Sequence, residues 1–147
     1  MTSINEILTQ AAELRVGISR LLCNSTYRQY GDLSTLKANR QDGEQIFLLD
    51  ELQGIMEKLS EAEEAIYYIR RPVDEISHLH KNSSGQYETA QGRVFQCGHE
   101  IEAYVSDGWH DAPYWTRTRV EHDGRDYYLV GHRDVPLDGL VIRTRRK

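Results

Sequence analysis

Apolar positions near the start of the chain recur at helical spacing. Between residues 4 and 21 they alternate steps of three and four, which places them on one stripe of a helix. These positions are Ile4, Ile7, Ala11, Leu14, Ile18 and Leu21. Ser3 with Glu6 forms a capping-box pattern before the stripe, and Asn24 with Ser25 is expected to end the helix.

A second and longer apolar repeat follows. Asp42 with Gln45 is a capping pattern, and the steps of four and three then continue without a break. The repeat consists of Leu48, Leu52, Ile55, Leu59, Ala62, Ile66 and Ile69. This helix is expected to end at Arg71, because Pro72 disfavours helical backbone in the residue before it. Two helices with matching seams predict an antiparallel, coiled-coil-like helical hairpin over residues 1–71.

The connection between these helices, residues 24–43, has no clear pattern. A structureless connection of this length is uncommon inside a compact domain, so we expect a helical turn near residues 33–39 or an extension of the first helix. If the connection is mobile, Tyr27 and Tyr30 become candidates for a contact loop. A thin hairpin leaves apolar surface on its outer side. It should therefore lie against the rest of the chain or form a homodimer with a second copy.

From residue 86 onward the apolar pattern is that of strands. Ile101, Ala103 and Val105 share one face, while Glu102 and Tyr104 take the other. Asp-Gly pairs, which favour type I′ hairpin turns, separate short runs rich in aromatic and β-branched residues. The pairs are Asp107-Gly108, Asp123-Gly124 and Asp138-Gly139. The expected strands cover residues 86–89, 93–96, 100–105, 114–122, 126–130 and 140–145.

An open sheet of so many short strands would expose both of its faces to solvent. We therefore expect the strands to close into a small barrel. Residues 72–85 contain the loop-forming run Asn-Ser-Ser-Gly and are expected to be a linker. The predicted fold class is therefore α+β. A helical hairpin over 1–71 is followed by a linker over 72–85 and an SH3-like antiparallel β-barrel over 86–147.

Composition narrows the functional classes. Charged residues make up 28% and hydrophobic residues 39% of the chain, which is typical of a globular protein rather than a disordered one. The net charge is −5, and acidic residues exceed basic ones both before and after Pro72. Neither half is a basic body that would hold duplex DNA. With no signal-peptide pattern and no apolar run long enough for a membrane span, we expect a cytoplasmic protein.

Few patterns indicate catalysis. His78 with His80 and Cys97 with His99 have the i, i+2 spacing of conceivable zinc ligands, but the usual Cys-x-x-Cys spacing is absent. A nucleophilic pair of Cys97 with His99 or His122 would need an electropositive pocket that no local signature announces. No glycine loop for phosphate is present. We expect no enzyme activity, no metal and no cofactor, with Cys97 a free thiol.

One loop has the composition of a protein interface. Residues 106–114 read SDGWHDAPY, in which Trp109, His110 and Tyr114 offer aromatic contacts and Pro113 stiffens the backbone. Such side chains, together with the following Trp115, are typical anchors of protein–protein interfaces. An exposed Trp109 would support this interpretation. A buried Trp109 would instead be a residue of the hydrophobic core.

Two charged sets suggest further contacts. Arginines at alternate positions of two strands could form a nucleic-acid-binding face together with nearby aromatics. These arginines are Arg117, Arg119, Arg143 and Arg145. The alternative is that they pair with Glu102, Glu121 and Asp126 across the strands.

The second set is acidic and lies on the long helix. It comprises Glu57, Glu61 and Glu64, with Glu63 beside them. It is either a solvated face or a mimic of nucleic-acid charge that occupies a partner's basic channel.

Several runs in the second half resemble a known group of domains. The runs 82–88, 100–103, 120–122, 126–131 and 137–143 are similar to a family of small uncharacterised domains of Firmicute bacteria and their phages and mobile elements. The resemblance implies no catalytic residue. It implies an accessory role, because such proteins often bind host machinery, including defence nucleases.

The expected function is therefore non-enzymatic binding of a host protein or nucleoprotein complex. Its narrowest form is inhibition of a defence complex, as anti-CRISPR proteins do. The alternative is a nucleic-acid-binding module that uses the arginine face.

Overall fold

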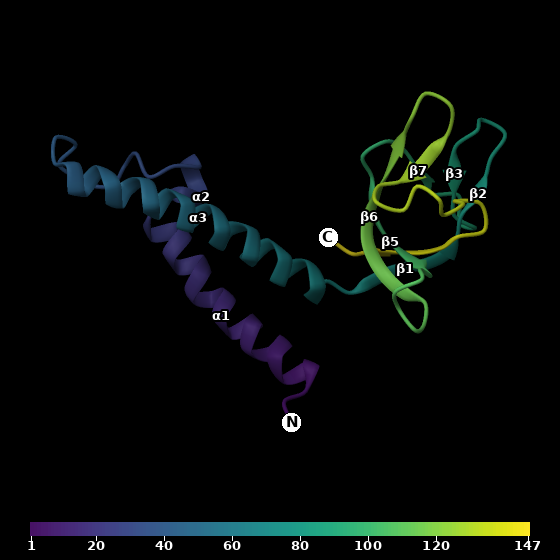
Figure 1. The fold of residues 1–147 in the computed structure, drawn as a ribbon, viewed down its shortest axis with the longest axis horizontal. Helices are drawn as coiled ribbons and strands as arrows, with labels where there is room; N and C mark the ends of the chain where they lie inside the picture. Colours follow the sequence, from purple (N-terminus) through teal and green to yellow (C-terminus); the bar gives the residue numbers. More distant parts are fainter. The chain divides into compact units, whose positions relative to one another are not determined.

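The computed structural model describes all 147 residues as two compact units, residues 1–70 and 71–147. The first, the helical unit, contains α1 (Ile4–Asn24), α2 (Tyr27–Tyr30) and α3 (Gly43–Arg70) (Figure 1). The second, the strand unit, contains eight short strands. The molecule thus combines a helical N-terminal part with antiparallel strands, as the α+β prediction states. No helix combines the length and hydropathy that crossing a membrane requires.

Both long helices begin where their caps predict. The Ser3 hydroxyl accepts a hydrogen bond from the Glu6 amide at 3.1 Å, and the Glu6 carboxylate accepts one from the Ser3 amide at 3.2 Å. This reciprocal pair is a capping box. Before α3, Asp42 accepts from the backbone amide of Glu44 at 3.0 Å and from the side-chain amide of Gln45 at 3.4 Å. Local side-chain chemistry therefore defines the starts of α1 and α3.

The connection between the long helices is partly ordered by packing. Four of its residues form α2, and Leu33 is buried in the core of the helical unit. The amide of Leu36 donates to the Leu33 carbonyl at 3.1 Å, which closes a turn, but residues 33–39 form no helix. The helical turn expected there is wrong in position, because the helical part of the connection is α2. Of the two tyrosines considered for a contact loop, Tyr27 packs against this core and Tyr30 is exposed.

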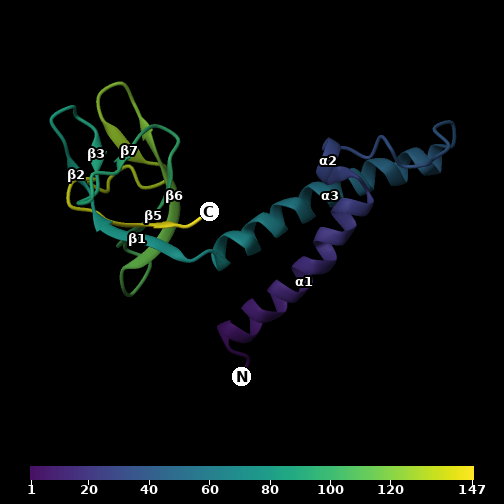
Figure 2. The same ribbon diagram turned by 180° about the vertical axis from the view of Figure 1, so that it is seen from behind.

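The contact between α1 and α3 uses only part of the predicted seam, namely Ile18, Leu59 and Ile66, together with neighbouring positions such as Leu22 and Met56. The buried residues of this unit are Ile18, Leu22, Leu33 and Met56, with Leu49, Leu59 and Ile66 half-buried around them. The helices run in opposite directions and diverge toward the N-terminus of α1 (Figures 1 and 2). The coiled-coil-like hairpin is therefore not confirmed. A helix turns about 100° per residue, so a contact face displaced by one position leaves most of the predicted seam outside it.

Most of the predicted seam lies in solvent. On α1 it comprises Ile4, Ile7, Leu14 and Leu21, and on α3 it comprises Leu48, Leu52, Ile55 and Ile69. We call these eight residues the open seam. Their exposed fractions run from 36% at Leu52 to 80% at Ile4. The helical unit thus presents an apolar stripe on each long helix beyond the one that it buries.

Six strands of the second unit confirm the prediction to within two residues at each end. They are β3 (Tyr87–Glu88), β4 (Val94–Phe95), β5 (Glu100–Val105), β6 (Tyr114–His122), β7 (Tyr127–Leu129) and β8 (Val141–Arg145). Two further strands, β1 (Val73–His78) and β2 (His80–Lys81), occupy residues that were expected to be a linker. That expectation was wrong for these residues because β1 pairs with β8, which is far away in sequence.

The strands form two sheets rather than one closed barrel. The larger has the order β1-β8-β5-β6-β7 and the smaller the order β2-β3-β4, with every pairing antiparallel. Since β1 and β7 are hydrogen-bonded to one neighbour each, the larger sheet is open. The SH3-like barrel is therefore not confirmed. A shared core, including Phe95, Ile101 and Ile142, takes side chains from both sheets.

The Asp-Gly pairs form turns of a different kind from those predicted. A type I′ turn needs positive φ at both central residues. Gly124 and Gly139 have positive φ, but neither Asp123 nor Asp138 does. Asp123 instead accepts hydrogen bonds from the amides of Arg125 and Asp126 at 2.9 and 3.0 Å. Its side chain, rather than a left-handed backbone, closes this turn.

Candidate protein-binding site

The loop between β5 and β6 is organised around one carboxylate. Asp107 accepts hydrogen bonds from the backbone amides of Trp109 and His110, each at 2.8 Å. Its other contacts are the His110 Nδ1 at 3.0 Å and the Tyr114 hydroxyl, which donates at 2.6 Å. An aspartate that satisfies the two amides following its own turn is a compact local motif. The loop therefore has a defined shape although it is exposed.

These bonds change the acidity of the groups that make them. The hydrogen bond from Tyr114, followed by those from His110 and the loop amides, holds the pKa of Asp107 well below its usual range. The same contact raises the pKa of Tyr114, because the carboxylate disfavours a phenolate beside it. Asp107 is thus ionised wherever the loop has this conformation at neutral pH.

The loop presents Trp109 to solvent. Its side chain is 93% exposed, the highest value among the large apolar residues after Met1 and far above that of any other aromatic residue. Beside it, the His110 and Tyr114 rings lie 4.2 Å apart at 37°. The sequence interpretation depended on an exposed Trp109, and that condition is met. His110 and Tyr114 support the loop from within.

Trp115 occupies a different environment from Trp109. It lies opposite Tyr104 in the β5–β6 pairing and stacks on it, with ring centroids 5.0 Å apart. The guanidinium of Arg143 lies 4.3 Å from the centre of the Trp115 ring. Trp115 is therefore half-buried in a stack at the base of the loop, where it stiffens the hairpin that carries Trp109.

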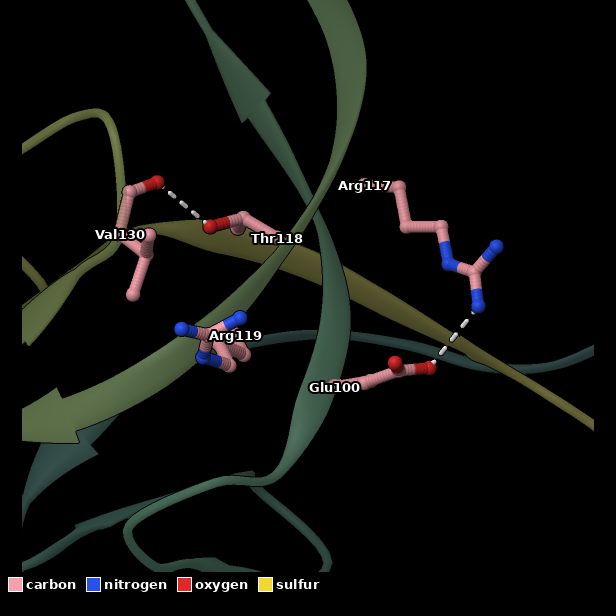
Figure 3. A pocket seen from close by; sticks show the side chains of 5 residues that line it. All are labelled: Glu100, Arg117, Thr118, Arg119 and Val130. Carbon is pink, nitrogen blue, oxygen red and sulfur yellow. Dashed lines mark hydrogen bonds and ion pairs between the residues drawn. The ribbon is translucent and has the colours of Figure 1, made fainter.

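Each arginine of the predicted nucleic-acid face has a carboxylate partner. Arg117 pairs with Glu100 at 3.1 Å, and Arg119 pairs with Glu121 at 2.9 Å. Figure 3 shows the first pair beside a pocket that Thr118 and Val130 complete. On β8, Arg143 and Arg145 both bind Glu102, the former at 2.7 Å. The structure thus brings the arginines onto neighbouring strands and pairs three of them with Glu102 and Glu121, two of the three carboxylates named in the alternative interpretation. Arg117 pairs instead with Glu100, and the third carboxylate, Asp126, pairs with Lys81.

Glu102 is the buried charge of the strand unit. It is 4% exposed and lies on the sheet face opposite the core residues Ile101 and Ala103. A carboxylate this deep requires partners, since removal of its hydration is costly. The two guanidinium groups above it supply them.

The acidic residues proposed on the long helix lie in solvent. Glu57, Glu61 and Glu64 are exposed on α3, whereas Glu63 binds Arg28 at 2.7 Å. That ion pair lowers the pKa of Glu63 and raises that of Arg28. The three exposed glutamates stay available to a partner, and Glu63 instead links α3 to α2.

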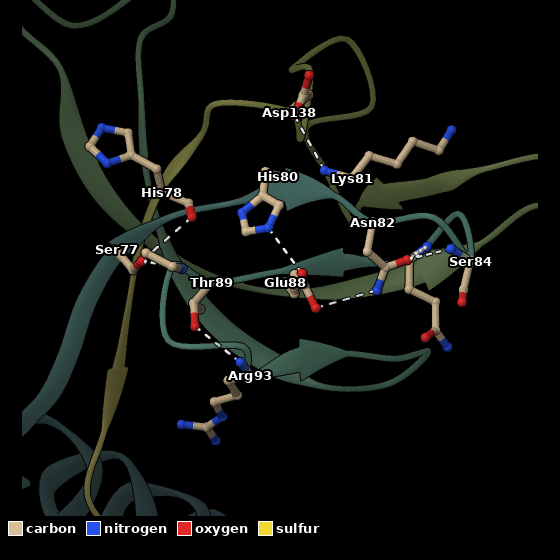
Figure 4. Close-up of polar contacts among 12 residues, drawn as sticks. Ser77, His78, His80, Lys81, Asn82, Ser84, Glu88, Thr89, Arg93 and Asp138 are labelled. Carbon is tan, nitrogen blue, oxygen red and sulfur yellow. Dashed lines mark hydrogen bonds and ion pairs between the residues drawn. The ribbon is translucent and has the colours of Figure 1, made fainter.

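The conceivable zinc ligands do not converge. His80 contacts Glu88 at 3.0 Å, and Figure 4 shows this pair together with the Asn82 amide that also reaches Glu88. His99 accepts a hydrogen bond from the Gln96 amide at 2.8 Å. No group of three or more histidine, cysteine, aspartate or glutamate side chains is placed to hold a metal ion.

The environment of Cys97 is unsuited to a thiolate nucleophile. Its thiol donates to Glu121 at 2.9 Å, and this hydrogen bond to a carboxylate raises the pKa of Cys97. Activated cysteines need the opposite, a nearby positive charge that stabilises the thiolate. The Cys97–His99 and Cys97–His122 hypotheses gain no support from this geometry.

Two residues that organise the site were not recognised from sequence. Asp107 was considered only as part of an Asp-Gly turn, although an aspartate two residues before Trp109 could have suggested a side-chain-closed loop. Tyr104 was assigned to an outer face without a partner. Its pairing with Trp115 depends on the strand register, for which no local signal exists.

Comparison with known families gives a match within the strand unit. Residues 77–144 match the sequence model of a family described as a domain of unknown function (DUF5348). The match begins within β1 and ends within β8, so it covers most of the strand unit and none of the helical unit. It agrees with the expected resemblance to an uncharacterised domain. No curated protein and no solved structure matches the chain.

Proposed function

We propose that the protein is a non-enzymatic binding protein that contacts a partner protein through the β5–β6 loop. The observation that carries this proposal is the 93% exposure of Trp109 on a loop that Asp107 holds in shape. A tryptophan in water has a large apolar area that a partner can cover. Because the loop is already ordered, little conformational entropy is lost when it docks.

The stack beneath the loop adds to this preorganisation. Tyr104, Trp115 and Arg143 fix the ends of β5 and β6 from which the loop departs. Interface hot spots are enriched in aromatic residues held by well-packed neighbours. Trp109 is thus the anchor, and His110 and Tyr114 shape its surroundings.

Nucleic-acid binding is the alternative, and the ion pairs weigh against it. A phosphate backbone would have to displace Glu100, Glu121 or Glu102 from the arginines that they bind. The strand unit also carries more acidic than basic residues after Pro72. Counterion release, which drives such binding, favours basic surfaces.

The nature of the partner stays a prediction. A host nucleoprotein or defence complex, and an origin in a phage or mobile element, were expected from the resemblance alone. The exposed Glu57, Glu61 and Glu64 are compatible with charge mimicry toward a basic channel.

The helical unit supports a second proposal, a homodimer. Ile7, Leu14 and Leu21 of the open seam are seven residues apart, as are Leu48 and Ile55. Heptad-spaced residues pack well against a second pair of helices. A two-fold arrangement would bring the same residues of both copies together, as isologous interfaces require.

The test compares affinity capture by the full-length chain, Trp109→Ala and Tyr30→Ala from a bacterial lysate, with and without nuclease treatment. Tyr30 is the control because it is also an exposed aromatic residue, 55% accessible, but lies in the helical unit. A protein retained by the wild type and Tyr30→Ala but reduced at least about tenfold with Trp109→Ala would support the proposal. Equal retention by Trp109→Ala would refute it, and loss of all captured material on nuclease treatment would favour the arginine face.

A further inference from the structure

One flank of the α3 seam packs inside the helical unit, and the other flank faces solvent. Leu49 and Met56 each follow a seam residue by one position, and both belong to the core that α1 completes. Leu48 and Ile55, the seam residues before them, are 47% and 45% exposed. α3 therefore uses one side of its apolar stripe for α1 and leaves the seam itself uncovered.

The solvent-facing flank carries one charge of each sign. Glu51 and Lys58 lie three residues after Leu48 and Ile55, which puts both on the side of the seam away from Met56. Both are exposed, and neither takes part in an ion pair of the chain. They are seven residues apart, or about 10.5 Å along the helix axis, so they do not pair with each other within one copy.

A second copy of α3 can satisfy both charges in one orientation. If two α3 helices run antiparallel along their seams, with a two-fold axis near Gly54, Glu51 of each copy lies beside Lys58 of the other. A parallel pair would instead place identical residues at the same level, glutamate against glutamate and lysine against lysine. Because like charges repel across an interface, charge complementarity favours the antiparallel orientation.

We propose that two copies associate through antiparallel α3 helices, with two Glu51–Lys58 ion pairs across a two-fold axis near Gly54. This arrangement rests on the homodimer proposed above and specifies its orientation. The same axis brings Leu52 of one copy level with Ile55 of the other, so the apolar layers and the ion pairs agree. Gly54 has no side chain, and nothing from the rest of the chain lies within 4 Å of the position that its Cβ would take. The helix surface beside the axis is thus free for a second copy.

The experiment measures self-association of the full-length chain and its charge variants by sedimentation equilibrium. Glu51→Lys and Lys58→Glu each place like charges at both contacts, so each should weaken self-association about tenfold. The double variant Glu51→Lys/Lys58→Glu exchanges the two charges and should associate as the wild type does. An equimolar mixture of the two single variants should form a heterodimer more tightly than either variant self-associates. These differences should shrink in about 1 M NaCl, because salt screens exposed charges.

The matched control is Asp50→Lys, which changes the charge by the same amount as Glu51→Lys. Asp50 is exposed and lies about 200° around the helix from Leu48, on the side away from the seam. This substitution should leave self-association unchanged. Circular dichroism of each variant checks that the helices persist.

Two outcomes would overturn the antiparallel arrangement while leaving a homodimer. The first is a dimer that Glu51→Lys weakens no more than Asp50→Lys does. The second is a double variant that associates as weakly as the single variants. A wild-type chain that is monomeric at every concentration would refute the homodimer and this arrangement together. The Trp109 proposal is tested separately, since Trp109 lies in the strand unit and is unchanged in every variant.

Discussion

The two units are of similar length but differ in how completely they bury their apolar residues. The strand unit has a core of eleven buried side chains, whereas the helical unit buries four. The strands enclose their core between two sheets, so their outer surface is left for polar networks and for Trp109. The two long helices contact each other along one stripe and leave the open seam in water. A domain with a complete core can expose one apolar side chain to a partner. A domain with an incomplete core exposes a long apolar stripe, which a partner can cover along its whole length.

The largest expected effect tests the completeness of the strand core. Phe95 is 1% exposed, so Phe95→Ala should lower the free energy of unfolding of this unit by about 3–5 kcal/mol. Both tryptophans lie in the strand unit, and their fluorescence during denaturation reports its unfolding. This decrease in the free energy of unfolding should be the same at all protein concentrations. A concentration-dependent loss would mean that the strand unit also relies on a second copy.

A slightly smaller effect concerns the buried charge. Glu102→Gln should cost about 3 kcal/mol, because it leaves Arg143 and Arg145 without their carboxylate. The matched control is Glu100→Gln, which removes the exposed pair with Arg117 and should cost about 0.5 kcal/mol. Denaturant titrations of both variants provide the comparison. Equal costs would contradict the distinction between the buried and exposed pairs.

The third prediction concerns the incomplete core of the helical unit. Leu52→Asp with Ile55→Asp places two charges on the open seam and should weaken self-association at least about hundredfold, or about 2.8 kcal/mol. Sedimentation equilibrium over micromolar concentrations measures this change, and circular dichroism checks that the helices persist. Glu57→Gln, an exposed change away from the seam, is the control. A wild-type chain that is monomeric throughout would rule out the dimer.

The smallest effect is local to the β5–β6 loop. Since the folded pKa of Asp107 is depressed, its contribution is present above the ordinary aspartate pKa of about 3.9 and is lost as pH falls below it. The backbone amide shift of Trp109, which donates to this carboxylate, should keep its native value near neutral pH and change only as pH falls below about 3.9. Asp107→Asn should displace it at every pH. A Trp109 amide shift that Asp107→Asn leaves unchanged would contradict the organising role of this carboxylate.

Much of the secondary structure could be predicted from sequence because its signals are local. The Ser3–Glu6 and Asp42–Gln45 pairs act within one helical turn. The alternation around Ala103 depends only on the geometry of a single strand. β1 was missed for the opposite reason. Its residues carry no strong alternation, and they form a strand because β8 offers them a pairing edge.

The candidate site divides in the same way. An aromatic loop at Trp109 could be recognised from composition, and its exposure agrees with that interpretation. The arginines could be placed on strand faces, but their availability depended on whether carboxylates lay opposite them. The register of the strands decides which carboxylates face the arginines. It places Arg143 opposite Glu102 and Arg119 opposite Glu100. Arg119 forms its ion pair with Glu121, two residues further along β6.

The sequence by itself therefore determined the two helices, most of the strands and the position of the aromatic loop, because caps, turns and periodicity act over a few residues. Only the tertiary structure decided which stripe of each helix is buried, whether the sheet closes, and which charges are paired. Neighbouring apolar stripes on a helix differ by a rotation that periodicity alone does not resolve. Ion pairs such as Arg145 with Glu102 join residues that only the packed fold brings together.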